Sequence, residues 1–266
     1  MEIVSQIVGP LGHLHFEAFN GAMDLEFCQD LTQAYQTLAQ TPEVKVILLW
    51  GGKDFFSNGI DLVTIHQQYN PTILAYKNLK GLNQLIRLIL ATTDKLVIAA
   101  MQGPAAAGGV MLALACDLRY AQTGLVLNPH YVNLGLCGSE FWSALLPQVV
   151  GLGWAQKLTL EAAPISADLA CRLGILHDQI EREQFEGEVN RRALFFATEN
   201  FEARLATKGL LLEQLRPVLE AAELAELKAM KDCCNHQEFD QARSAFIAKE
   251  GSPQFAALAT KGPEGD

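Results

Sequence analysis

Two short, strongly apolar runs limit what this chain can fold into more than any other feature. They are VKVILLW, residues 44–50, and KLVIAAM, residues 95–101, and a glycine-containing turn follows each. Runs of this length and residue type are typical of strands that are buried on both faces of a parallel sheet. Helical spacing over about residues 72–90 predicts a helix between them. Strand, helix and strand in this order predict an α/β fold.

Further elements are predicted on both sides of this unit. Polar and apolar residues alternate over 2–7 and 13–16, and a Gly-Pro-Leu-Gly turn between them predicts a hairpin. Asp24 is the expected N-cap of a helix that ends near Gln40. Shorter strands are expected over 117–121, 125–127 and 176–180.

The C-terminal third has apolar residues at helical spacing but little parallel sheet left to cover. We therefore expect a core over 1–200, a helical oligomerisation region over 201–250 and a flexible tail over 251–266. Helices that extend beyond a sheet domain bury their apolar stripes against something, and a neighbouring subunit is one solution. A homo-oligomer is the resulting prediction.

Charge and composition disfavour several classes of protein. The net charge is −10, with 20 Lys and Arg against 30 Asp and Glu, so a broad nucleic-acid surface is not expected. No apolar stretch reaches the ~18 residues of a membrane span, and the N-terminus does not resemble a secretory signal. The six cysteines are scattered and are expected to be reduced. His13 and His15 fit a solvated strand face better than a metal site. Together these observations predict a cytoplasmic protein without a bound metal or nucleic acid.

A glycine-bearing loop follows each apolar run. The first, FFSNGID, covers residues 55–61, and the second, AAAGG, covers residues 105–109. Both precede a predicted helix, where free main-chain N–H groups favour the binding of an oxyanion. Neither has the spacing of a phosphate-binding loop. Tight turns that serve packing alone are the competing interpretation.

Four separated runs make the sequence resemble the enoyl-CoA hydratase/isomerase, or crotonase, superfamily over about residues 1–250. The runs are FFSNGIDL, AAMQGPAAAGGVMLALACDLRYA, VNLGLCGSEFWSALLPQVVG and ISADLACRLGIL. The resemblance implies a spiral of ββα units with a C-terminal helical region, assembled as trimers or dimers of trimers. It also implies an acyl-CoA ligand, with coenzyme A present as part of the substrate and no permanently bound cofactor.

The resemblance places two main-chain N–H groups, those of Asn58 and Gly108, on the thioester oxygen. Such donors stabilise the charge that develops on a thioester carbonyl. Asp61 matches a family aspartate that would fix the first loop, although a plain helix N-cap explains it equally well. The neighbours expected to shape the ligand site are Ser57, Gly59, Asp61, Ala107 and Gly109.

Two departures from the hydratase pattern bear on the reaction. Hydratases of the family carry one glutamate two positions beyond the double glycine and a second about 20 residues later, and here these positions read Met111 and Tyr131. A methionine exchanges no proton, and a phenol with a pKa near ~10 is a weak base at neutral pH. Ordinary enoyl-CoA hydration is therefore disfavoured.

A narrower resemblance is to the crotonase-like C-terminal domain of the HypX hydrogenase-maturation proteins. It rests on the runs NGAM, FSNGI, NPHY and GSEFW. It implies a lyase that releases carbon monoxide from formyl-CoA, with a separate formyl- or acyl-transferring protein as partner. Tyr131 would donate a hydrogen bond near the acyl group, Glu140 would act as general acid and base, and His130 is a weaker candidate.

Other interpretations stay open at this point. Tyr131 can be a core aromatic with a satisfied hydroxyl, and Glu140 a carboxylate in solvent at a helix start. In the acid/base role too, a helix N-terminus would tend to keep Glu140 ionised. An isomerase or decarboxylase of acyl thioesters would need only the one base, Glu140. A CoA-binding subunit without catalysis would fit the missing glutamates.

Overall fold

A six-stranded sheet forms the centre of the structure, a computed structural model that describes residues 1–129 and 131–248. The order is β1-β2-β4-β6-β8-β11, with β1 antiparallel to β2 and the other neighbours parallel. The two apolar runs of the sequence are adjacent in it, because β4 pairs directly with β6. The strands are β1 (Glu2–Val8), β2 (Leu11–Glu17), β4 (Val46–Trp50), β6 (Leu96–Met101), β8 (Leu118–Gln122) and β11 (Asp178–Ile180).

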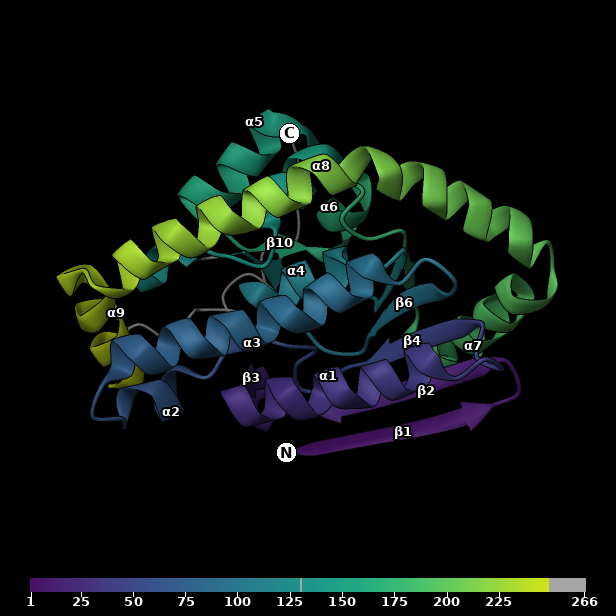
Figure 1. Cartoon of the computed structure of the whole chain (residues 1–266), viewed down its shortest axis with the longest axis horizontal. Coiled ribbons are helices and arrows are strands. Elements are labelled where there is room, and N and C mark those ends of the chain that lie inside the picture. Colours follow the sequence, from purple (N-terminus) through teal and green to yellow (C-terminus); the bar gives the residue numbers. More distant parts are fainter. Residues whose placement is uncertain (130, 249–266) are drawn as a thin grey trace.

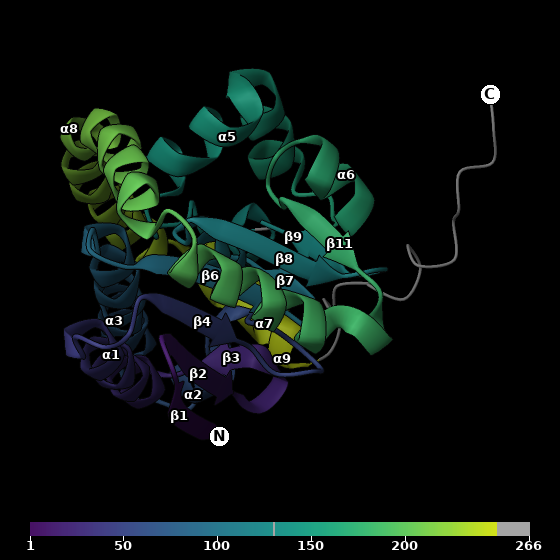
Figure 2. The ribbon, with the colours of Figure 1, turned by 90° about the vertical axis from the view of Figure 1, so that its right-hand side faces the viewer.

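Both faces of this sheet are covered, which explains why its central strands are apolar throughout. Ile47 and Leu49 of β4 belong to the core under helices α1 and α3, whereas Val46, Leu48 and Trp50 belong to the core under α7. Figure 1 shows α1 and α3 side by side, and Figure 2 shows α7 on the opposite side of the sheet. The helices are α1 (Leu25–Gln40), α2 (Leu62–His66), α3 (Pro71–Ala91), α4 (Gly108–Leu114), α5 (Trp142–Gln156), α6 (Ala167–Arg172), α7 (Arg182–Thr198), α8 (Phe201–Cys234) and α9 (Gln237–Ile247).

Two small sheets bring the glycine-bearing loops together. Strand β3 pairs with β5, and β7 pairs with β9, which in turn pairs with β10. A bridge between Ser57 and Ala105 then joins the first loop to the second. The spacing of the loops in sequence is thereby converted into contact in space. The elements are β3 (Ala22–Met23), β5 (Gly59–Ile60), β7 (Ala105–Ala106), β9 (Val126–Asn128), β10 (Ile165–Ser166) and the short turns η1 (Phe19–Gly21), η2 (Tyr131–Leu134) and η3 (Lys157–Glu161).

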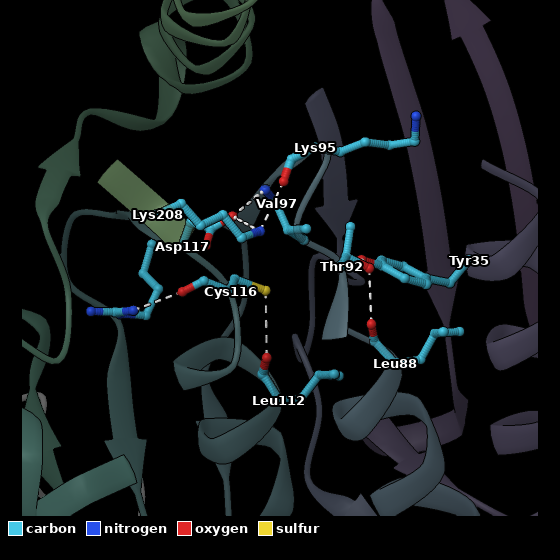
Figure 3. A network of polar contacts seen from close by, with 10 residues as sticks. Tyr35, Leu88, Thr92, Lys95, Val97, Leu112, Cys116, Asp117 and Lys208 are labelled. Atoms are coloured by element: carbon cyan, nitrogen blue, oxygen red, sulfur yellow. Dashed lines mark hydrogen bonds and ion pairs between the residues drawn. The ribbon is translucent and has the colours of Figure 1, made fainter. Parts of the chain in front are cut away.

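The long helix α8 begins at Phe201 and lies across α3 and α5 of the same chain, as Figures 1 and 2 show. An ion pair anchors it to the sheet: Lys208 Nζ lies 2.7 Å from Asp117 Oδ2 and donates to the Lys95 carbonyl at 2.8 Å (Figure 3). The same carboxylate oxygen accepts from the Val97 N–H. Leu219 and Met230 of α8 are buried within the chain, whereas Leu210, Leu211, Val218 and Leu224 are exposed. The homo-oligomer stays a prediction.

Several local predictions can be compared directly with the structure. The Asp24 side chain accepts from the Phe27 N–H at 2.8 Å, which confirms the predicted N-cap of α1. The predicted solvated face of His13 and His15 is wrong for His13, which is 8% exposed, stacks beside Trp50 and accepts from its Nε1 at 3.2 Å. His15 is exposed, as predicted. Among the described residues, no helix combines the length and apolar character needed to cross a bilayer. His130 and the predicted tail over 251–266 lie outside the described residues.

Candidate active site

A mostly apolar cavity of about 440 Å³ lies beside the two glycine-bearing loops. Its walls come from η1, β5, α2, α3, α4 and η2, with single side chains from α8 and α9. A larger hollow, of about 780 Å³, lies between α5 and α8 and contains none of the predicted site residues. The predicted residues that line the smaller cavity are Asn58, Asp61, Ala107, Gly108, Tyr131 and Glu140.

Gly108 presents a free main-chain donor to this cavity. It is the first residue of α4, where N–H groups have no partner inside the helix. No acceptor among the described residues is bonded to its N–H. Gly59 has no side chain to cover this nitrogen, and a Cβ there would lie 3.1 Å from it. One oxyanion donor is thus placed as the resemblance implies.

The second expected donor is not available. The Asn58 N–H donates to the Gly21 carbonyl at 2.7 Å, next to the pairing of β3 with β5. The prediction of two free amides is therefore wrong for Asn58, because strand pairing uses its donor. Its side chain lines the cavity nevertheless and donates to the Asn20 carbonyl at 2.6 Å.

Three of the expected ligand-site residues lie behind the cavity wall. Ser57 is fully buried and its hydroxyl accepts from the Gly59 N–H at 3.1 Å. Gly109 lies so close to Ser57 that a Cβ on it would stand 2.0 Å from the Ser57 carbonyl oxygen. Ser57, Gly59 and Gly109 are not part of the cavity lining. They hold the two loops together, and their place in the ligand site stays a prediction.

Asp61 is the N-cap of α2. Its Oδ1 accepts from the N–H groups of Val63 and Thr64 at 2.8 and 3.1 Å, and its Oδ2 accepts from the Thr64 hydroxyl. The capping interpretation is therefore correct, and the cap also fixes the first loop at the cavity edge.

Ala107, immediately before the free donor, has a strained backbone. Its φ of 47° and ψ of −126° belong to a region that residues with a side chain rarely adopt. The Asn128 carbonyl accepts from its N–H at 2.8 Å and holds this conformation. Strain of about 1–3 kcal/mol is typical of functional turns, and here it aims the Gly108 N–H at the cavity.

Glu140 brings a carboxyl group to the same point. It is 1% exposed, and an added Cβ on Gly108 would lie 2.9 Å from its Oε1. Its Oε2 accepts from the Ser139 N–H at 2.9 Å. Burial raises the pKa of Glu140 to about 7, with a smaller contribution from the negative Glu226 and against the effect of the Ser139 hydrogen bond. The expectation of a solvated, ionised helix-start carboxylate is therefore wrong, because Glu140 precedes α5 and is enclosed.

Tyr131 completes the polar groups of the cavity. Its hydroxyl is buried without a hydrogen-bond partner among the described residues, so the satisfied-core interpretation is wrong. It lies beside the Glu140 carboxyl group, and the interaction between the two contributes to the pKa shift of each. Burial raises its pKa well above the usual value, and the neighbouring carboxylates add to this shift. The phenol therefore keeps its proton and lies at the cavity beside the Glu140 carboxyl group.

Met111, which occupies the position of the first hydratase glutamate, cannot take part in a reaction in the cavity. Met111 is fully buried in the core on α4 and does not line the cavity. Glu140 is the carboxyl group that lies against the Gly108 donor.

Sequence reasoning missed two residues that hold Glu140. Asn83 of α3 accepts from the Glu140 N–H at 3.0 Å, and Glu226 of α8 accepts from the Phe141 N–H at 2.8 Å. Both are buried. Their polar character on otherwise apolar helix faces was the available signal, but only the fold shows that they meet this loop.

Comparison with known proteins agrees with this geometry. The family model for enoyl-CoA hydratase/isomerase matches residues 14–257. The hydrogenase maturation factor HoxX of Bradyrhizobium diazoefficiens is 36% identical over 250 residues, which cover 91% of this chain and 44% of HoxX. The crotonyl-CoA hydratase of Syntrophomonas wolfei is 26% identical over 229 residues, 86% of this chain and 87% of that protein.

Solved structures give the same answer. HypX of Aquifex aeolicus, crystallised with tetrahydrofolic acid, has a TM-score of 0.89 and 32% identity over all of this chain and 49% of its own. An enoyl-CoA hydratase of Bacillus halodurans, 22% identical over 91% of this chain and 99% of its own, shares the fold with a TM-score of 0.83. The chain spans about half the length of HoxX and HypX. These matches confirm the predicted resemblance and the crotonase fold: the chain belongs to the enoyl-CoA hydratase/isomerase family.

Proposed function

We propose that this protein is a CoA-thioester lyase that releases carbon monoxide from formyl-CoA. The observation that carries the proposal is the buried carboxyl of Glu140, which lies against Gly108 and has a pKa raised to about 7. A general acid and base works best with a pKa near the pH of the reaction. The similarity to HoxX and HypX supports the hydrogenase-maturation context.

In this proposal the Gly108 N–H binds the carbonyl oxygen of the thioester. Glu140, beside the same glycine, then faces the carbon that bears the formyl hydrogen. The ionised carboxylate takes the formyl proton, and the electron pair of the C–H bond becomes the lone pair on the carbon of carbon monoxide. The C–S bond breaks, its electron pair leaves with sulfur as the CoA thiolate, and Glu140 returns the proton to that thiolate. Formyl-CoA thus gives carbon monoxide and CoA, with no other reactant.

Tyr131 assists as a hydrogen-bond donor and not as the acid. An ordinary thiol has a pKa near ~8.5, below that of the buried phenol. Proton transfer from Tyr131 to a thiolate is therefore uphill, whereas transfer from Glu140, with a pKa of about 7, is downhill. A donor aimed at the leaving sulfur still stabilises its developing charge.

A second candidate is an isomerase or decarboxylase of acyl thioesters. The observation that favours it is the same single carboxyl, since one base is enough to move a proton along an acyl chain. Hydration of enoyl-CoA is the less suitable reaction, because Met111 is enclosed in the core and cannot help to position a water molecule.

In the test, purified protein is incubated in parallel with formyl-CoA, with malonyl-CoA and with a 3-enoyl-CoA. Formyl-CoA should yield headspace carbon monoxide and free thiol in equal amounts, and Glu140→Gln should slow the release of both about 10³-fold. Product from only one of the other thioesters would replace the lyase with that activity. Binding of acyl-CoA with no product from any of them, and no effect of Glu140→Gln beyond stability, would identify a CoA-binding subunit. A separate formyl-transferring protein belongs to the proposal as the source of the thioester.

A further inference from the structure

The loop that carries Glu140 has two consecutive residues in a conformation that side chains disfavour. The φ angles are 66° at Glu140 and 61° at Phe141, and neither residue is a glycine. This conformation is unfavourable for residues that carry a side chain, so the surrounding structure has to hold the loop in place. The Glu140 carboxyl takes its position against Gly108 from this bend.

The loop is held from two sides by side chains of distant helices. On the N-terminal side, Asn83 Oδ1 of α3 accepts from the Glu140 N–H at 3.0 Å and from the Ser139 hydroxyl at 3.1 Å. On the C-terminal side, Glu226 Oε2 of α8 accepts from the Phe141 N–H at 2.8 Å. Glu226 Oε1 accepts from the Ser143 N–H at 2.8 Å and from its hydroxyl at 2.6 Å.

Besides accepting hydrogen bonds, Glu226 brings a carboxyl group close to Glu140. It is 5% exposed, and its three donors are all uncharged. Burial raises the pKa of Glu226, and the three hydrogen bonds act against this shift and favour its ionised form near Glu140. No cation among the described residues forms an ion pair with Glu226. Burying a carboxylate without a paired cation, next to a second carboxyl group, costs free energy of folding. A functional role would account for keeping this arrangement.

We propose that Glu226 is a positioning residue for Glu140. Its two oxygens hold the amides of Phe141 and Ser143 so that the strained bend places the Glu140 carboxyl at the Gly108 donor, and its charge keeps that carboxyl able to take and return a proton. Helix α8 is then part of the active site. Docking of α8 against the Glu140 loop is required for Glu140 to act as acid and base. The inference rests on the proposed function, in which Glu140 is the acid and base.

The other titratable groups around Glu140 place no free charge next to its carboxyl group. Tyr131 of η2 is neutral, and the buried Cys28 thiol of α1 is neutral because burial raises its pKa to about 12. Arg87 of α3 lies over the Phe141 ring, 5.9 Å from its centroid, but pairs with Glu223 of α8. Glu226 is therefore the charged side chain bonded directly to this loop.

The first test measures the protonation of Glu140 without any substrate. The carboxyl signal of Glu140 is followed against pH by isotope-edited infrared or carbon NMR spectroscopy and assigned by its loss in Glu140→Gln. In Glu226→Gln the charge disappears and one of the two amides loses its acceptor, so the titration midpoint should fall by about one pH unit. The matched control is Glu220→Gln, the same change at an exposed position of α8, which should leave the midpoint unchanged.

The second test measures turnover. In Glu226→Gln we expect kcat to fall at least ~10-fold, with KM little changed because Glu226 does not line the cavity. The acid side of the pH profile should move with the infrared midpoint. Glu226→Asp keeps the charge but draws it back from the amides, so kcat should fall while the midpoint stays near that of the parent protein. This variant also serves if Glu226→Gln does not fold.

The outcomes separate the two proposals. An unchanged Glu140 titration in folded Glu226→Gln would overturn the role of Glu226, whatever the activity. A shifted titration together with no turnover of any thioester would support the positioning role and overturn the proposed lyase. If Glu226→Gln lowers the melting temperature but leaves the Glu140 titration midpoint and kcat unchanged, Glu226 serves only as a helix cap, and the inference is contradicted.

Discussion

Asp117 and Glu140 are two enclosed carboxyl groups in opposite settings. Asp117 faces Lys208 at 2.7 Å and accepts from the Val97 N–H (Figure 3). Glu140 forms no ion pair among the described residues, lies near Glu226 and borders a cavity. Burial raises the pKa of both, but at Asp117 the Lys208 charge acts against the shift. The paired carboxylate holds α8 on the sheet, and the other is the group to which the proposed function assigns proton exchange.

The largest effect should come from removing the unpaired group. Glu140→Gln should lower kcat about 10³-fold, the size expected for loss of a general acid and base. Because the pKa of Glu140 is about 7 in the folded protein and 4.5 as a free side chain, folding binds a proton between these values. Wild-type stability therefore falls as pH rises from 4.5 to 7, and the variant escapes this loss.

Urea unfolding at two pH values checks this sign. At pH 8 the variant should be more stable than the parent protein by roughly 2–3 kcal/mol, and at pH 4 the difference should disappear. A variant that is less stable at pH 8 would show that Glu140 is ionised and well satisfied in the folded protein, like Asp117.

Breaking the paired group should affect folding and not chemistry. Asp117→Asn leaves the Lys208 ammonium without its counter-ion in a nearly buried place, which should cost about 3 kcal/mol in the free energy of unfolding. The double variant Asp117→Asn, Lys208→Met should recover most of that loss. Denaturant midpoints measure both, and kcat of the folded fraction should stay close to that of the parent protein.

A smaller effect is expected from covering the oxyanion donor. Gly59→Ala places a methyl group about 3.1 Å from the Gly108 nitrogen at a φ of 80°, and loss of one such donor lowers kcat by about 10²-fold. Gly124→Ala is the matched control, since Gly124 has a φ of 81° and no atom within 4 Å of the added group. Equal kinetic effects of the two substitutions would exclude a role for the Gly108 N–H.

The smallest effect is expected at the phenol. Tyr131→Phe removes a buried hydroxyl without a partner, so it should raise stability by up to about 1 kcal/mol and lower kcat about 10-fold. Tyr35→Phe is the control, because the Tyr35 hydroxyl is bonded to Thr92 Oγ1 at 2.9 Å and its loss should destabilise. If both substitutions destabilise alike, Tyr131 is a core residue like Tyr35.

Local periodicity and chemistry were enough for much of the fold. The runs at β4 and β6, the Asp24 cap of α1 and the glycine-bearing loops are decided by residues close in sequence, whose preferences act over a few positions. The motifs also placed Gly108, Tyr131 and Glu140 at one site, and the cavity contains all three.

Long-range contact decided the rest. The Asn58 amide is used by Gly21, which lies 37 positions earlier, and Glu226 reaches the Glu140 loop from more than 80 positions away. The amino-acid sequence by itself determined which side chains are able to donate, accept or titrate. Only the tertiary structure decided which donors are already occupied and which carboxyl is enclosed without a cation, because hydrogen-bond pairing and burial depend on segments that meet only when the chain has folded.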